Sequence, residues 1–168
     1  MVPIGAVGAF KAVMAAAAVA VLLVAGGGSA LAGSRVNTGY FGGVAIMGYD
    51  PVAYFTEGRP VKGSPEFQHE FLGETWHFAS AANRDAFAAD PVAYAPQYGG
   101  YCAGEILQAD VTTGVTTNID PRAWRVIDGK LYLFYDRGYA EVFEAKAEDL
   151  VAKADANWPK VEARLLTQ

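Results

Sequence analysis

The most reactive side chain in this sequence is a single thiol. Cys102 lies in the run Tyr98-Gly99-Gly100-Tyr101-Cys102-Ala103, and the 168 residues contain no other cysteine. A thiolate binds soft metal ions and is the nucleophile of redox chemistry, but free cysteines are also among the most frequently buried residues. Four roles therefore stay open for Cys102: a packed core residue, a metal ligand, a redox thiol, or half of an intermolecular disulfide.

A soft metal such as copper needs more than one thiolate, so a metal site would require helpers for Cys102. The sequence offers two histidines, His69 and His77, and the thioether of Met47. Cys102, His69 and His77 are therefore the candidate metal ligands, with Met47 as a further soft donor.

Both histidines fall in a predicted β-hairpin. Residues 67–72 and 75–78 are rich in aromatic side chains and flank Gly73-Glu74, which fits a two-residue type II′ turn. In this register Phe71 lies opposite Trp76, so one face of the hairpin is aromatic.

The same register separates the two imidazoles. It pairs His69 with Phe78 on the aromatic face and His77 with Glu70 on the other face. We therefore expect a core His69 with a hydrogen-bonded ring and a surface pair of His77 with Glu70. Two imidazoles on opposite faces cannot chelate one ion together.

A second hairpin is predicted further along the chain. Residues 124–127 return as residues 130–135 through Asp128-Gly129, a pair typical of a type I′ turn. Both faces of this hairpin carry apolar side chains, so we expect other elements to cover it on both sides.

Short helices are indicated by three Asp-Pro pairs, because aspartate caps free amides and proline suits the first helical position. They predict helices at about 51–56, 91–96 and 121–124. Ser80 is the expected cap of another helix over about 81–89, which stops before Pro91.

The C-terminal part changes to a helical period after Asp136. Tyr139, Val142 and Phe143 fall on one side of the first predicted helix, and Pro159 is expected to kink or end the second. Strands and helices mix without a regular βαβ alternation, so the expected fold class is α+β.

Residues 33–168 are long enough for one domain with a substantial core, and no internal repeat is evident. The formal net charge is −5 and no basic block occurs, which argues against a nucleic-acid partner. No Ser-His-Asp order, paired-carboxylate signature, HExxH or CxxC motif is present, so no residue set supports an enzyme.

The first 32 residues are typical of an export signal. From Ala12 to Ala25 every residue is apolar, a stretch short for a membrane span and suited to a signal-peptide core. Ser29-Ala30-Leu31-Ala32 gives the small-x-small pattern of a cleavage site after Ala32. We expect a periplasmic or extracellular protein with no stable membrane span after cleavage, the alternative being an uncleaved anchor.

Several strings taken together resemble the YHS domain, and more narrowly the exported bacterial YHS domain-containing proteins, some of which are selenoproteins. The resemblance covers about residues 38–159. It rests on Gly48-Tyr49-Asp50-Pro51-Val52-Ala53-Tyr54-Phe55, Gly73-Glu74-Thr75-Trp76-His77-Phe78-Ala79-Ser80, Asn83-Arg84-Asp85-Ala86-Phe87, Asp90-Pro91, Tyr98-Gly99-Gly100-Tyr101-Cys102-Ala103 and Asp128-Gly129-Lys130-Leu131-Tyr132-Leu133.

The resemblance implies a small domain that often binds copper, mercury or similar ions through cysteine. This chain departs from that pattern at three positions where the family often carries metal-binding side chains, and has Ala53, Ala79 and Asn83 instead. The usual thiolate site is therefore absent, and metal binding does not carry over residue by residue.

Three hypotheses follow from the sequence. The first is a non-catalytic exported binding module that takes copper or another soft metal through Cys102. The second is a metal-free structural or interaction module with a partner in the cell envelope. The third is a single-thiol redox protein, which would need a depressed thiol pKa.

Overall fold

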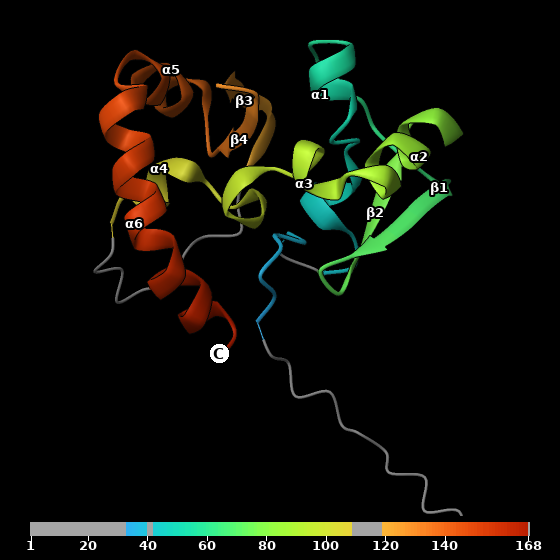
Figure 1. Ribbon diagram of the computed structural model, residues 1–168, viewed down its shortest axis with the longest axis horizontal. Helices are drawn as coiled ribbons and strands as arrows, with labels where there is room; N and C mark the ends of the chain where they lie inside the picture. Colours follow the sequence, from blue (N-terminus) through green and yellow to red (C-terminus); the bar gives the residue numbers. More distant parts are fainter. Residues whose placement is uncertain (1–32, 40–41, 109–118, 168) are drawn as a thin grey trace, which may run out of the picture.

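The computed structural model describes residues 33–39, 42–108 and 119–167. They form two antiparallel two-stranded sheets and a set of mostly short helices, which confirms the predicted α+β class (Figure 1). The expected signal segment, residues 1–32, lies outside the described residues. In the described part of the chain, no helix has both the length and the apolar character needed to cross a membrane.

The first six elements gather on one side of the molecule (Figure 1). They are the 3-10 turn η1 (Ala45–Gly48), the helix α1 (Ala53–Thr56), the strands β1 (Ser64–Phe71) and β2 (Glu74–Phe78), and the helices α2 (Ala81–Ala89) and α3 (Pro91–Tyr94). Phe87 of α2 packs against Trp76 and Phe78 of β2, so the aromatic face of the hairpin is closed by α2.

The next six elements lie mainly on the other side (Figure 1). They are η2 (Gln97–Gly100), α4 (Ala103–Ile106), β3 (Asp120–Ile127), β4 (Lys130–Phe134), α5 (Arg137–Ala145) and α6 (Ala147–Leu165). The long helix α6 is tied to the end of α4, because the amide of Asn157 donates to the carbonyl oxygens of Ile106 and Leu107.

The first hairpin turns one residue earlier than predicted. Leu72 and Gly73 form the turn with φ of 54° and 81°, which fits type I′ in place of the expected type II′ at Gly73-Glu74. Phe71 therefore lies opposite Glu74, and the register differs from the expected one by two residues. Because side chains alternate along a strand, a shift of two leaves every residue on its predicted face.

The histidines keep their predicted faces but not their predicted partners. His69 lies opposite Trp76 on the aromatic face, and His77 lies opposite Gln68 on the other. The expected pair of His77 with Glu70 is wrong, because Glu70 instead accepts a hydrogen bond from the hydroxyl of Thr75.

The second hairpin is confirmed with its Asp128-Gly129 turn, in which both residues have positive φ. Residues 131–134 of β4 are all buried, as expected for a strand that is covered on both faces.

The predicted helix at 121–124 is wrong, because these residues belong to β3. The carboxylate of Asp120 accepts the backbone N–H of Arg122 and pairs with its guanidinium, which is a local turn and not a helix cap. Pro121 lies near the start of the strand, where the register shifts and a missing N–H costs little.

Two other helix starts follow the sequence signals. The hydroxyl of Ser80 accepts the N–H of Asn83 at the start of α2, and the carboxylate of Asp90 accepts the N–H of Ala93 at the start of α3. Both caps sit where the sequence predicts them.

The C-terminal helices differ in detail from expectation. Ala140 and Phe143 form the buried side of α5, whereas Tyr139 and Val142 are exposed. The inner face follows from how α5 lies on the second hairpin, which the helical period alone does not determine. Helix α6 continues through Pro159 to Leu165, so the proline does not end it.

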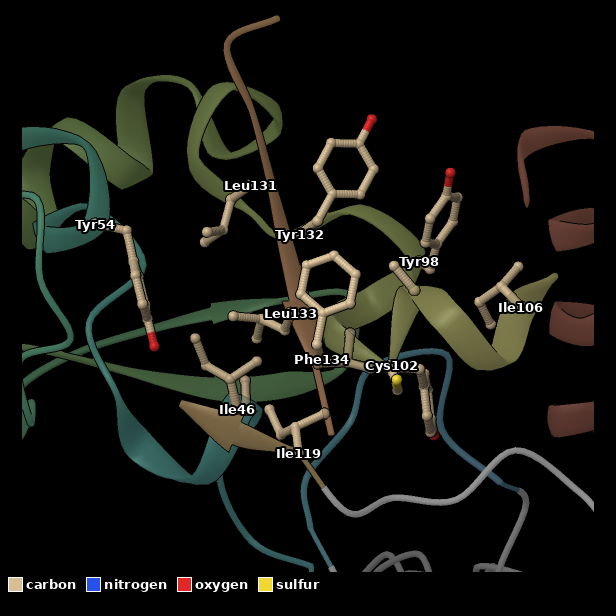
Figure 2. Packing of buried hydrophobic residues seen from close by; sticks show 14 of the residues in the cluster. Ile46, Tyr54, Tyr98, Cys102, Ile106, Ile119, Leu131, Tyr132, Leu133 and Phe134 are labelled. Atoms are coloured by element: carbon tan, nitrogen blue, oxygen red, sulfur yellow. The ribbon is translucent and has the colours of Figure 1, made fainter. Parts of the chain in front are cut away.

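One hydrophobic core joins the two sides of the molecule (Figure 2). Ile46 of η1 and Leu133 of β4 both approach Gly100 of η2 closely. The hydroxyl of Tyr54 in α1 donates to the carbonyl oxygen of Pro121 in β3 at 3.0 Å. The core therefore fixes the loops that carry the candidate site residues.

Candidate functional site

Cys102 stands at the junction of η2 and α4, and Figure 2 shows its sulfur among core side chains. Tyr98, Gly99 and Gly100 all have positive φ and reverse the chain just before it. Asn37 holds this turn, because its backbone N–H donates to the carbonyl oxygen of Gly99 and its side chain donates to that of Gly100. The turn delivers Cys102 into the interior.

The thiol is sealed from solvent. Cys102 is 1 % exposed, and its Sγ accepts the backbone N–H of Tyr135 at 3.3 Å. Burial raises the pKa of the Cys102 thiol above its ordinary value, although the backbone amides of Tyr135, Glu105 and Gly104 act in the opposite direction. The thiol therefore forms a thiolate, which is the metal-binding and nucleophilic form, less readily than an exposed cysteine does.

His69 belongs to the aromatic cluster of the first hairpin. Its ring packs edge-on against Phe87 with 6.0 Å between centroids. Figure 1 places β1 and β2 on the other side of the molecule from α4 and β4, which flank Cys102. His69 is therefore a packing residue that lies away from the thiol.

His77 faces a lysine on the opposite side of the hairpin. Both side chains lie beside Gly48: a Cβ added to this glycine would be 3.4 Å from the Nδ1 of His77 and 3.6 Å from the Nζ of Lys62. Burial, followed by the charge of Lys62, lowers the pKa of His77. A neighbouring ammonium would also oppose a metal cation at this imidazole.

Met47 lies near the same lysine through its backbone. The ammonium of Lys62 donates to the carbonyl oxygen of Met47 and sits 4.8 Å from the ring centroid of Tyr49. The Met47 side chain approaches Gly39. These are packing contacts of the turn η1, whose other three residues are buried.

The fold therefore separates Cys102 from His69, and places the two histidines on opposite faces of one hairpin. Across the residues that the structure describes, no three side chains of His, Cys, Asp or Glu gather as a metal-binding group. Within this part of the chain, the candidate ligands Cys102, His69 and His77 do not come together as one donor set for a soft metal ion.

The most connected polar residue is one that the sequence analysis treated as a helix cap. Asp50 is fully buried, and its Oδ1 accepts the backbone N–H groups of Val52 at 2.8 Å and Ala53 at 3.3 Å. Its Oδ2 accepts the backbone N–H of Ala79 at 2.8 Å and the side-chain amide of Asn83 at 2.6 Å. One carboxylate thus ties α1, the end of β2 and α2 together.

These partners include all three positions at which the chain lacks the metal-binding side chains that the family often carries. Ala53 is far in the sequence from Ala79 and Asn83, and each of the three residues donates a hydrogen bond to Asp50. An ionised carboxylate has about four lone-pair sites, and four donors occupy them here. The three positions therefore converge on Asp50 through two backbone N–H groups and one side-chain amide, and none of the three side chains is a donor that soft metal ions prefer.

The only sequence signal for this centre was the Asp50-Pro51 pair, which also occurs at Asp90 and Asp120. The pair predicts a cap at each site and cannot single out the one that reaches across the fold. Its long-range partners lie 29 and 33 residues further on.

A comparison with protein families finds the YHS domain over residues 52–98, which confirms the resemblance for this part of the chain. The matched segment runs from α1 to η2 and includes Ala53, Ala79 and Asn83. No curated protein and no solved structure gives a significant match.

Proposed function

We propose that this YHS-domain protein is an exported, non-catalytic interaction module that holds no soft metal in its YHS unit and binds a protein of the cell envelope. The observation that carries the proposal is the Asp50 carboxylate, which accepts four hydrogen bonds where the three expected ligand positions converge. The centre is a structural anchor in place of a metal site.

The chemistry of the available donors supports this reading over a metal site. A soft ion such as copper prefers thiolate, thioether and imidazole donors. The only thiol is buried and its pKa is raised, and the two imidazoles are on opposite faces of the hairpin. Copper binding through Cys102 would require the core around it to open.

The same thiol environment opposes a redox function. Reactive cysteines are exposed and have depressed pKa values, whereas the pKa of Cys102 is raised and its side chain is buried.

Exposed apolar side chains support a protein partner. Tyr139 and Val142 lie three residues apart in α5 and are 53 % and 58 % exposed, so they share one side of the helix and form a small apolar surface. Tyr135, which precedes the helix cap Asp136, is 47 % exposed.

A copper(I) competition tests the metal-free centre. The purified protein is titrated against a chromogenic copper(I) chelator, beside a variant with cysteine at positions 53, 79 and 83 as the positive control. We expect the triple variant to withdraw copper from the chelator and the unmodified protein to withdraw none. Stoichiometric binding by the unmodified protein that disappears in Cys102→Ala would refute the proposal and restore the copper hypothesis.

A photo-crosslinker at position 139, compared with one at the exposed Ala88 of α2, tests the partner in intact cells. A crosslink to one envelope protein from position 139 alone is expected. Equal labelling from both positions, or none from either, removes the interaction role. Export is checked by the mass of the protein from the periplasmic fraction, which should lack residues 1–32.

A further inference from the structure

We propose that the chain from η2 to α6 is a second copy of the unit from η1 to α3, and that Cys102 is the counterpart of Asp50. Both halves contain the same six elements in the same order: a 3-10 turn, a short helix, two strands and two helices. The family match begins after η1 and ends within η2, so it covers most of the first copy and almost none of the second. The proposal gives Cys102 a role as a positioning residue.

The two hairpins correspond residue by residue with an offset of 56. Strands Ser64–Phe71 and Glu74–Phe78 match Asp120–Ile127 and Lys130–Phe134 in length and position. Their registers also match, including an irregularity in the same place. It lies between Ser64 and Gln68 in the first hairpin and between Asp120 and Trp124 in the second.

The following helices keep the same offset. Helices α2 and α5 have equal lengths. Ser80 caps the first through the N–H of Asn83, and Asp136 caps the second through the N–H of Tyr139. The next helices begin at residues 91 and 147, which again differ by 56.

The packing of the hairpin on its helix is also repeated. Phe78 lies 5.1 Å from Phe87 between ring centroids, and the matching rings of Phe134 and Phe143 lie 5.2 Å apart. The pair Trp76 and Phe87 at 5.2 Å corresponds to Tyr132 and Phe143 at 5.6 Å. Equivalent rings therefore fill equivalent places in the two halves.

The opening turns repeat with an offset of 52. In each, three successive residues have positive φ: residues 46–48 in the first and 98–100 in the second. A tyrosine in extended conformation ends each turn, and its N–H bonds back to the third residue before it. Such runs are rare outside glycine, so a chance recurrence is a poor explanation.

The residues after these tyrosines, Asp50 and Cys102, accept equivalent hydrogen bonds. Asp50 accepts the N–H of Ala79, and Cys102 accepts the N–H of Tyr135, which lies 56 positions after Ala79. Asp50 also accepts the N–H groups two and three residues ahead of it. The amides two and three residues ahead of Cys102 likewise act on its sulfur. Each side chain thus anchors a turn to the end of a hairpin.

The sequence hides the repeat because few side chains are shared. Between residues 64–91 and 120–147, the identical pairs are Pro65/Pro121, Gly73/Gly129, Phe78/Phe134, Phe87/Phe143 and Ala89/Ala145. The two halves keep turn and ring positions while exchanging nearly everything else, including carboxylate for thiol at the anchor.

Two substitutions at Cys102 distinguish an acceptor from a packing residue. If Cys102 only fills space, Cys102→Val should be tolerated and Cys102→Asp should unfold the protein, because a buried unpaired charge is strongly destabilising. If Cys102 is the counterpart of Asp50, three backbone amides can donate to a carboxylate at this position. Cys102→Asp should then be more stable than Cys102→Val. Leu133→Asp, at a fully buried neighbour, is the control that shows a carboxylate is not tolerated in general.

We expect Cys102→Asp to fold at pH 7 and to melt above Cys102→Val. A melting temperature for Cys102→Asp below that of Cys102→Val overturns the role of Cys102. Should both variants fail to fold, spin-label distances decide the repeat. The pair at positions 72 and 89 and the matching pair at 128 and 145 should give the same mean distance, and unequal distances overturn the repeat.

Discussion

Replacement of Asp50 by alanine is the most direct test of how this molecule is held together. The substitution removes an acceptor for four donors, but the donors differ in what they can do next. Ala53 and Val52 are buried, so their N–H groups lose all partners. The donors of Ala79 and Asn83 belong to half-buried residues and can find water.

The magnitude follows from the two stranded amides. Each buried unsatisfied donor costs about 1–3 kcal/mol, and the lost charge-assisted bonds of the half-buried pair add about 1 kcal/mol. We expect Asp50→Ala to lower the free energy of unfolding by about 3–7 kcal/mol. That is a large part of the stability of a typical domain, roughly 5–15 kcal/mol. Asp50→Asn keeps one acceptor oxygen but turns an NH₂ group toward the other donors. We therefore expect it to lower the free energy of unfolding by about 2–3 kcal/mol.

The measurement is urea unfolding followed by tryptophan fluorescence, with Trp76 in the first hairpin as a local reporter. Asp85→Ala is the matched control, because Asp85 is an exposed aspartate of α2 whose partner is Arg84. An exposed ion pair contributes about 0–1 kcal/mol, so the control should hardly change. A loss below about 1 kcal/mol for Asp50→Ala would refute the view that this carboxylate anchors the unit.

Two further predictions concern the second half of the chain. A Cβ on Gly99 would stand 1.9 Å from the carbonyl oxygen of Arg35, whereas Gly129 has a similar positive φ and open space. Gly99→Ala should therefore cost more than about 3 kcal/mol and Gly129→Ala about 1 kcal/mol in thermal melts, and equal losses would contradict this account. The raised thiol pKa means that folded Cys102 keeps its proton to a higher pH than the unfolded chain does. The unfolding free energy should then fall, relative to Cys102→Ser, as the pH rises from about 8 to about 10, and a constant difference between the two proteins would be inconsistent with a buried neutral thiol.

The elements that the sequence predicts well are those encoded within a few residues. The Asp128-Gly129 turn sets both the second hairpin and its register, because only residues that tolerate positive φ suit a type I′ turn. Ser80 and Asp90 begin helices where predicted, since a cap bonds to an amide three residues ahead. The faces of the first hairpin were also predictable, because alternation survives a shift of two residues.

The wrong predictions occur where a local signal has two outcomes. Asp120-Pro121 can start a helix or a strand, and pairing with β4 decides for the strand. The period of α5 offers two neighbouring faces, and contact with the second hairpin selects Ala140 and Phe143. Tertiary contacts settled each case because the local free-energy difference between the alternatives is small.

By itself, the sequence determined the α+β class, the Asp128-Gly129 turn, the caps of α2 and α3 and the presence of a YHS domain. Only the tertiary structure decided that Cys102 is buried and that Asp50 gathers Ala53, Ala79 and Asn83 around one carboxylate. The reason is range: turns and caps act over two to four residues, whereas burial and these hydrogen bonds join segments about thirty residues or more apart. The same reason hides the repeat, which is preserved in backbone geometry and ring packing while the side-chain identities have changed.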